Sequence, residues 1–190
     1  MTEEDDDDEV KEDIEMTEDS EVTTFTTTEV TEITETTEYV NEDDEDEINK
    51  ILKEYGFKQG NKVDFAAEIG RIDLIKLLTQ LGKKGTYFAI DYAAKNGHVE
   101  VLKYLHLLGY KGTTDAIDYA AENGHLEVLK YLHSLGYEGT TKADDYAIIN
   151  GHLEVIKYLY SIGYLKTDFA IKYANVLLNN EKNASTMHKK

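Results

Sequence analysis

The chain of 190 residues contains no cysteine and no proline. Without cysteine it has no disulfide bond, no thiol nucleophile and no thiolate ligand for a metal, which agrees with a reducing compartment. Proline interrupts helices. Residues 46–180 also lack strand-length runs in which apolar and polar residues alternate. These absences favour an all-α protein.

The chain also lacks the signals that direct a protein to a membrane. Its apolar runs fall short of the ~18 residues that a membrane span requires. Its N-terminus is acidic, whereas a signal peptide needs a basic start and an apolar core. We therefore expect an intracellular protein that is neither secreted nor bound to a membrane.

The net charge of −19 is concentrated at the N-terminus. Residues 1–50 hold 23 of the 39 acidic residues and only two lysines, a net charge of −21, whereas the rest of the chain has a net charge of +2. A near-neutral body lacks the basic surface of nucleic-acid-binding proteins, and the acidic part is repelled by phosphates. These charges argue against a nucleic-acid partner.

Residues 1–45 form a low-complexity acidic arm. Acidic runs at 3–9 and 42–47 flank a threonine-rich stretch at 21–40. Its apolar residues are too sparse to bury a core and its like charges repel one another, so we expect the arm to be disordered. These apolar residues include Val22, Phe25, Val30, Ile33 and Val40.

A unit of 27 residues repeats through the remainder of the chain. Residues 116–142 differ from residues 89–115 at only five positions, and the copies on either side are more diverged. A fixed period of this size predicts a stacked solenoid. We divide the domain at 46–180 into a partial unit 46–61, units 62–88, 89–115, 116–142 and 143–169, and a C-terminal capping helix 168–180, followed by a frayed tail 181–190.

Each unit is predicted to form two short antiparallel helices. In the unit 116–142 the first helix spans about 116–123 and ends at Gly124, since glycine adopts the left-handed conformation found just past a helix end. The second helix spans about 126–135 and ends in a Schellman motif at Gly136. Thr140 and Thr141 then supply hydroxyl groups to cap the next first helix.

Two columns of polar residues recur with the period of 27. Equivalent positions in stacked helices lie roughly 8–10 Å apart, whereas two zinc-bound nitrogens lie within ~4 Å of each other. We therefore expect packing roles: each histidine seats the start of a second helix, and each aspartate favours the start of its own first helix through the helix dipole. The columns are His98, His125 and His152, and Asp64, Asp91, Asp118 and Asp145.

No residue of the chain stands in a recognisable catalytic or cofactor-binding motif. No serine, threonine or lysine has a nucleophile setting, and the glycines at 136 and 139 lack the spacing and the lysine of a phosphate-binding loop. The sequence therefore predicts no catalytic residue, no cofactor and no metal site, and the protein is not expected to be an enzyme.

The segment from Asn123 to Leu132, with Tyr119 to Ala121 before it, closely resembles the ankyrin repeat. The resemblance recurs at 96–105 and 150–159, in weaker form at 69–78, and covers about residues 48–179. It implies a stack of helix–turn–helix units with loops that project to one side, used to bind other proteins.

The sequence departs from the common ankyrin pattern in two ways. Its period is 27 rather than about 33 residues, and Asp-Ala-Ile-Asp at 115–118 replaces the usual Thr-Pro-Leu-His opening. The missing residues are those that would build projecting β-hairpins, so we expect short inter-unit turns. The short period resembles ankyrin repeats of amoebae and of large DNA viruses that infect them. A viral chain would act in the host cell.

Three of the five differences between the near-identical units exchange charge. They lie on the first helix or the inter-unit turn, the side that ankyrin-like stacks use for partners. We therefore predict a monomeric, non-enzymatic module that binds a protein through this surface. An alternative hypothesis is that the acidic arm binds a basic protein surface, as an effector or decoy, while the repeats anchor it. The candidate residues are Lys95, Lys111, Asp115, Glu122, Glu138 and Lys142.

Overall fold

A computed structural model of the chain describes residues 42–187. Nearly all of the acidic arm expected at 1–45 lies outside these residues, and its last four residues belong to a helix. Within residues 42–187 the chain forms ten helices and no strand, so the all-α prediction is confirmed. The helices are α2 (Glu42–Glu54), α3 (Lys62–Glu68), α4 (Ile72–Gln80), α5 (Phe88–Lys95), α6 (Val99–Leu107), α7 (Asp115–Glu122), α8 (Leu126–Ser134), α9 (Lys142–Ile149), α10 (Leu153–Ser161) and α11 (Asp168–Met187).

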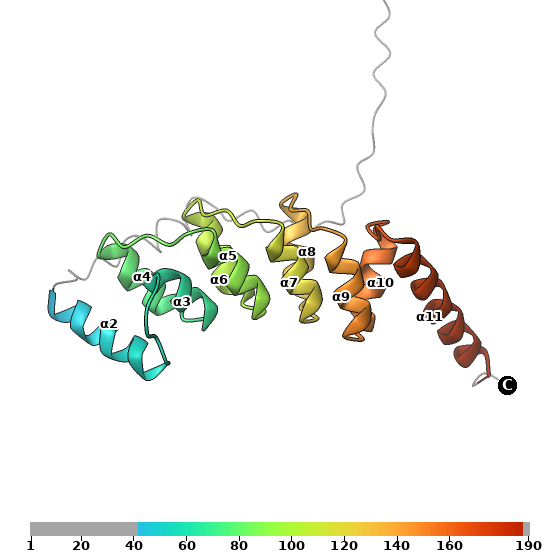
Figure 1. Ribbon diagram of the computed structural model, residues 1–190, viewed down its shortest axis with the longest axis horizontal. Helices are drawn as coiled ribbons and strands as arrows, with labels where there is room; N and C mark the ends of the chain where they lie inside the picture. The colour runs from blue at the N-terminus through green and yellow to red at the C-terminus, as the bar shows by residue number, and fades with distance from the viewer. Residues whose placement is uncertain (1–41, 188–190) are drawn as a thin grey trace, which may run out of the picture.

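The helices stand side by side in an elongated row that runs from α2 to α11 (Figure 1). The first helices of successive units, α3, α5, α7 and α9, pack on one another and form one layer. The second helices, α4, α6, α8 and α10, form the other layer. The inter-unit turns, residues 82–87, 109–114, 136–141 and 163–167, lie along the upper edge of the row in Figure 1. This arrangement is the predicted solenoid.

The core lies between the two layers and continues from unit to unit. Pairs of fully buried alanines, such as Ala120 and Ala121, allow the first helices to approach closely. The second helices contribute larger side chains, such as Leu129 and Leu132, which are also fully buried. Close packing of small side chains against large ones fixes the spacing between units.

Glycines end the helices as the sequence predicted. After α7, Gly124 has a φ of 77° and the backbone N–H of His125 donates to the carbonyl of Ala120 at 2.9 Å. After α8, Gly136 has a φ of 78°, and Tyr137 donates to the carbonyl of Leu132 at 3.1 Å. These are the bonds of a Schellman motif, which satisfies carbonyl groups at the end of a helix.

Helices of different kinds close the two ends of the stack. At the N-terminal end α2 packs on α4 and buries Ile48 and Leu52. At the C-terminal end α11 packs on α9 and α10 and buries Ala170 and Ala174. Helix α11 continues to Met187, so residues 181–187 are helical where a frayed tail was expected. No glycine or proline interrupts residues 168–187, which accounts for the longer helix.

Candidate functional site

The aspartate column links each unit to the next. Asp91 in α5 is almost fully buried. It accepts hydrogen bonds from the backbone N–H of Thr113 at 2.8 Å and from the Thr113 hydroxyl at 2.9 Å. The Thr113 hydroxyl in turn accepts from the backbone N–H of Asp115 at 3.1 Å, at the start of α7. The pairs Asp64–Thr86 and Asp118–Thr140 repeat this arrangement.

This geometry extends one expectation from the sequence and corrects another. The aspartates bind the threonine that precedes the next first helix, in addition to lying at the start of their own. Thr140 caps α9 as predicted, by accepting from the backbone N–H of Lys142 at 3.1 Å. Thr141 makes no capping hydrogen bond. Burial raises the pKa of Asp91, and the hydrogen bonds from Thr113 act in the opposite direction.

The last junction of the stack is built differently. Asp145 continues the aspartate column only weakly: it accepts from the Thr167 hydroxyl at 3.4 Å. The fully buried carboxylate is instead Asp144, at the position that Ile117 occupies one unit earlier. Asp144 accepts a hydrogen bond from the backbone N–H of Lys166, and burial raises its pKa. Its second oxygen has no hydrogen-bond partner within the described residues.

Two compensating substitutions explain this junction: one side chain is smaller than in the unit before, and the residue that packs against it is larger. One unit earlier, a Cβ on Gly139 would lie 2.6 Å from Ile117 Cγ2, so only glycine fits there. At the last junction the smaller Asp144 replaces the isoleucine, and Lys166 takes the place of the glycine. The Lys166 ammonium donates to the carbonyl of Gly139 at 2.7 Å.

The histidine column also joins neighbouring units, a role that the sequence analysis did not predict when it placed each histidine at the start of a second helix. His125 precedes α8, and its Nε2 lies 3.0 Å from the carbonyl oxygen of Lys95 at the end of α5. A carbonyl only accepts, so Nε2 is the donor. The ring lies against Gly97, where a Cβ would be 2.7 Å from the His125 Nδ1. His98 and His152 make the same bond to Glu68 and Glu122.

Two further histidines lie between second helices, and the sequence analysis did not identify them. His106 Nδ1 is 3.1 Å from the hydroxyl of Tyr131, and its Nε2 is 2.9 Å from the hydroxyl of Tyr137. His133 Nδ1 is 3.1 Å from the hydroxyl of Tyr158. Burial lowers the pKa of both histidines. The recurrence of Tyr-Leu-His at 104–106 and 131–133 was the signal that could have found them.

The outer surface of the first helices carries three columns of side chains, which we call the first-helix face. The middle column is aromatic and half-buried throughout. The two flanking columns change in chemical type from unit to unit. The middle column is Phe65, Tyr92, Tyr119, Tyr146 and Tyr173; the flanking columns are Asn61, Phe88, Asp115, Lys142 and Phe169, and Glu68, Lys95, Glu122, Ile149 and Val176.

The columns of the first-helix face contact one another within and between units. In α5 the rings of Phe88 and Tyr92 stack with centroids 5.1 Å apart. The ammonium of Lys95 lies 5.5 Å from the ring centroid of Tyr119 in the next unit, a distance at which a cation is attracted to a ring face. The aromatic column was not predicted, although its period of 27 is visible in the sequence.

The structure divides the six candidate residues into two groups. Four of them belong to the flanking columns of the first-helix face: Lys95, Asp115, Glu122 and Lys142. The other two, Lys111 and Glu138, are exposed in the inter-unit turns after α6 and α8. Asp115 and Glu122 are half-buried, whereas the other four are exposed.

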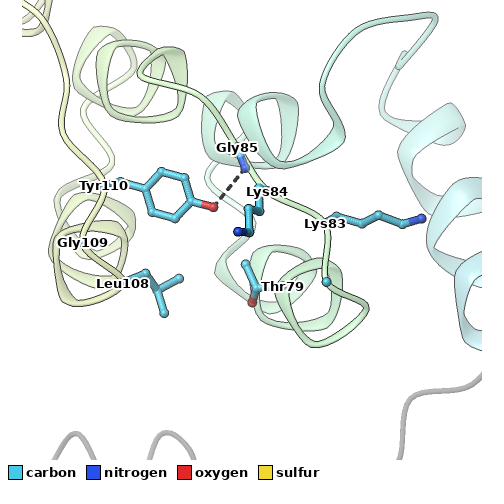
Figure 2. A pocket seen from close by; sticks show the side chains of 8 residues that line it. Thr79, Lys83, Lys84, Gly85, Leu108, Gly109 and Tyr110 are labelled. Carbon is cyan, nitrogen blue, oxygen red and sulfur yellow. Dashed lines mark hydrogen bonds between the residues drawn. The ribbon is translucent and has the colours of Figure 1, made fainter.

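Two grooves lie between successive inter-unit turns. The first has a volume of about 370 Å³ and is lined by Thr79, Lys84, Leu108 and Tyr110, among others. Figure 2 shows the hydroxyl of Tyr110 bonded to the backbone N–H of Gly85, at 2.9 Å. The second groove, of about 480 Å³, lies one unit further along. It is lined by His106, Tyr110, Lys111, Leu135 and Tyr137, together with glycines of the turns.

Within residues 42–187 no group of three histidine, aspartate or glutamate side chains is placed to hold a metal ion. No helix in the same part of the chain is long and apolar enough to cross a membrane.

A family model matches the repeat region of the chain. The model of the family described as "Ankyrin repeats (3 copies)" matches residues 63–143 and 90–172. No curated protein matches the chain.

Proposed function

Because the chain belongs to the ankyrin repeat family, whose repeats are generally protein–protein interaction modules, we propose that it binds a protein partner without catalysing a reaction. The binding surface is the first-helix face together with the adjoining inter-unit turns. We also propose that the protein acts as a monomer inside a cell. Sedimentation at increasing concentration tests the monomer, since a dimer would sediment faster.

The observation that carries the proposal is the contrast within the first-helix face. Aromatic side chains occupy every position of the middle column, and aromatic residues are enriched in protein interfaces. The flanking positions differ between units that are otherwise nearly identical. A constant aromatic column supplies contact area, while variable neighbours select the partner.

The flanking columns indicate what kind of partner fits. In the central units they carry charges of both signs, such as Lys95, Asp115 and Lys142. Toward the C-terminal end they become apolar and exposed: Ile149 is 73% exposed and Phe169 is 60% exposed. A partner that matches this face carries charged groups over α5, α7 and the start of α9, and an apolar anchor over the end of α9 and over α11.

The stack holds this surface in place before a partner arrives. The Asp91–Thr113 pair fixes α7 relative to α5, and the His125–Lys95 bond fixes the other end of the same helices. A pre-organised surface loses little conformational entropy on binding.

The test is affinity capture by the full chain followed by mass spectrometry, compared between two variants. In the first variant four charges are reversed: Lys111→Glu, Asp115→Lys, Glu138→Lys and Lys142→Glu. In the matched control four charges on second helices are reversed: Glu127→Lys, Lys130→Glu, Glu154→Lys and Lys157→Glu. Both changes leave the net charge unaltered.

The unmodified chain and the control should capture the same proteins, and we expect the first variant to lose them. The helical content of the unmodified chain and of both variants should be the same. Equal capture by the two variants would falsify the assignment of the surface.

The acidic arm provides a second candidate function, favoured by its charge. Residues 1–41 hold 17 acidic residues and one lysine. The arm would then bind a basic protein surface while the repeats anchor it. Removal of residues 1–41 leaves α2 and the stack complete. This candidate predicts that removal abolishes capture and that capture by the full chain weakens with salt. Full, salt-insensitive capture by the shortened chain would exclude it.

A further inference from the structure

Lysines without an acidic neighbour gather on the inter-unit turns of the first two full units. Lys84 follows α4 and Lys111 follows α6, and both are exposed. Neither forms an ion pair within residues 42–187. The next turn carries Glu138 at the position of Lys111. The turns after α4 and α6 are therefore two successive turns that each carry an exposed lysine at the same position of the repeat.

Each of these lysines borders a groove with an apolar side. Lys84 and the exposed Leu108 line the first groove, and Lys111 and the exposed Leu135 line the second. In Figure 2 the Lys84 side chain lies beside Tyr110 and Thr79, whereas Lys83 extends away from the groove. The two grooves are one repeat apart, so they present the same pair of features, a cation and an apolar wall, twice in a row.

The first turn of α2 lies beside this surface. Glu45, in the first turn of α2, lies 3.0 Å from the Lys83 ammonium and 3.2 Å from the Lys62 ammonium. The hydrogen bonds from Lys83 and Lys62 lower the pKa of Glu45, and the bond from Lys83 has the larger effect. Lys83 precedes Lys84 directly. The start of α2 therefore lies beside the turn after α4, which carries Lys84.

We propose that residues 21–40 of the same chain dock on the turns after α4 and α6. Their carboxylates face Lys84 and Lys111, and their apolar side chains enter the two grooves. Residues 21–40 hold five glutamates and no basic residue, which is the charge that the two lysines attract. The segment is a better match than an external acidic protein because its attachment at α2 gives it a high effective concentration at this surface.

The spacing of the segment fits the spacing of the grooves. Val30 and Ile33 are three positions apart in the sequence and follow Glu29 and Glu32. In a polyproline II conformation three residues span about 9 Å and complete one turn, so both side chains point the same way. Packed helices of successive units lie ~8–10 Å apart. The pair Val30 and Ile33 can therefore occupy neighbouring grooves.

The connection to the stack is long enough for this placement. Ile33 precedes Glu42 by nine positions, which allows a reach of up to ~30 Å. The proposal does not depend on the partner of the first-helix face, because it concerns a contact within one chain and its test needs no second protein.

The lack of cysteine makes a clean test possible, because one introduced cysteine takes a single spin label. In the full-length Thr31→Cys variant, labelled with a nitroxide, we expect the amide signals of Lys84, Gly85, Lys111 and Gly112 to weaken at least about twofold at low ionic strength. The signals should recover as salt screens the charges.

Two pairs of substitutions with the same change of charge provide the control. Lys84→Glu with Lys111→Glu should restore the amide signals, whereas Lys103→Glu with Lys130→Glu, on the second helices, should leave them weakened. All four lysines can be changed without touching the core, and unchanged amide shifts of the buried alanines confirm that the stack is intact.

Three outcomes overturn the proposal. The first is no weakening at low salt, and the second is weakening confined to the first-helix face. The third comes from a mixture of labelled chains with unlabelled, isotopically enriched chains: weakening in the enriched chains shows that the arm of a second copy is the occupant.

Discussion

Asp118 and Thr140 are 22 residues apart in the chain and are joined by two hydrogen bonds of 2.7 Å. The carboxylate of Asp118, in α7, accepts from both the backbone N–H and the hydroxyl of Thr140, which precedes α9. A buried carboxylate that accepts two bonds from the next unit holds the two units in a fixed orientation. The link is polar and directional, unlike the apolar packing around it.

Replacement of Asp118 by alanine tests this link. The substitution leaves the backbone N–H of Thr140 without its partner, and we expect it to lower the free energy of unfolding by about 2 kcal/mol. Urea unfolding, followed by circular dichroism, measures the change. Glu127→Ala, at an exposed position, serves as control and should stay within about 0.5 kcal/mol of the unmodified chain. Equal effects of the two substitutions would show that the link contributes little.

Gly139→Ala tests the close approach between units. The new Cβ would lie 2.6 Å from both Asp118 Oδ1 and Ile117 Cγ2, neither of which can move without disturbing the core. We expect destabilisation by about 1–3 kcal/mol, the usual cost of overpacking. Thermal unfolding of this variant and of Glu138→Ala, the exposed neighbour in the same turn, gives the comparison. A Gly139→Ala variant as stable as the control contradicts the predicted clash.

The half-buried His106 and His133 predict a loss of stability in mild acid. Burial lowers the pKa of His106 and His133 in the folded state, below the ordinary value of about 6.5. The unfolded chain therefore binds more protons as the pH falls, and the free energy of unfolding decreases between about pH 7 and pH 5. The stabilisation from these two histidines is complete at pH values above their unfolded-state pKa. It is lost as the pH falls toward their lower folded-state pKa.

His106→Gln isolates part of this effect, because glutamine does not titrate. Its unfolding free energy should change less steeply with pH over that range than that of the unmodified chain, as measured by urea unfolding at half-unit steps. The raised pKa values of Asp91 and Asp144 act with the opposite sign at more acidic pH. Equal slopes for the two chains would argue against a half-buried, neutral His106.

Ile149→Glu tests the apolar end of the first-helix face. Because Ile149 is 73% exposed, the substitution should change the free energy of unfolding by less than about 0.5 kcal/mol. Once a partner is captured, we expect its affinity to fall about tenfold, which corresponds to about 1.4 kcal/mol. Titration calorimetry measures this, and Leu153→Glu, at the start of α10, provides a control away from the face. A partner that binds both variants equally well does not use this end.

The fold was predictable because its determinants are local. The glycines at 124 and 136 end helices through their own backbone conformation, and the alanines of the first helices are visible as a pattern within eight residues. A period of 27 then fixes the stacking. The end of α11 was harder to predict, since a helix end without glycine or proline leaves no mark in the sequence.

The links between units were not predictable from single positions. Asp118 and Thr140 are polar residues in separate motifs, and only the fold shows that they meet. At the last junction the repeat pattern pointed to Asp145, whereas exchange of isoleucine for aspartate one residue earlier buries Asp144 instead. The aromatic column of the first-helix face was overlooked for a simpler reason: tyrosine at a regular period is equally compatible with a core position.

Gly139 packs against Ile117 and Asp118 in the same way that Gly112 packs against Ile90 and Asp91. The two central junctions are therefore interchangeable, and a 27-residue segment copied in tandem within the gene would find a matching neighbour on each side. The ends do not share this property, because Arg71 stands in place of the histidine and Lys166 in place of the glycine. Duplication can lengthen such a protein from its middle, while its ends stay as they are.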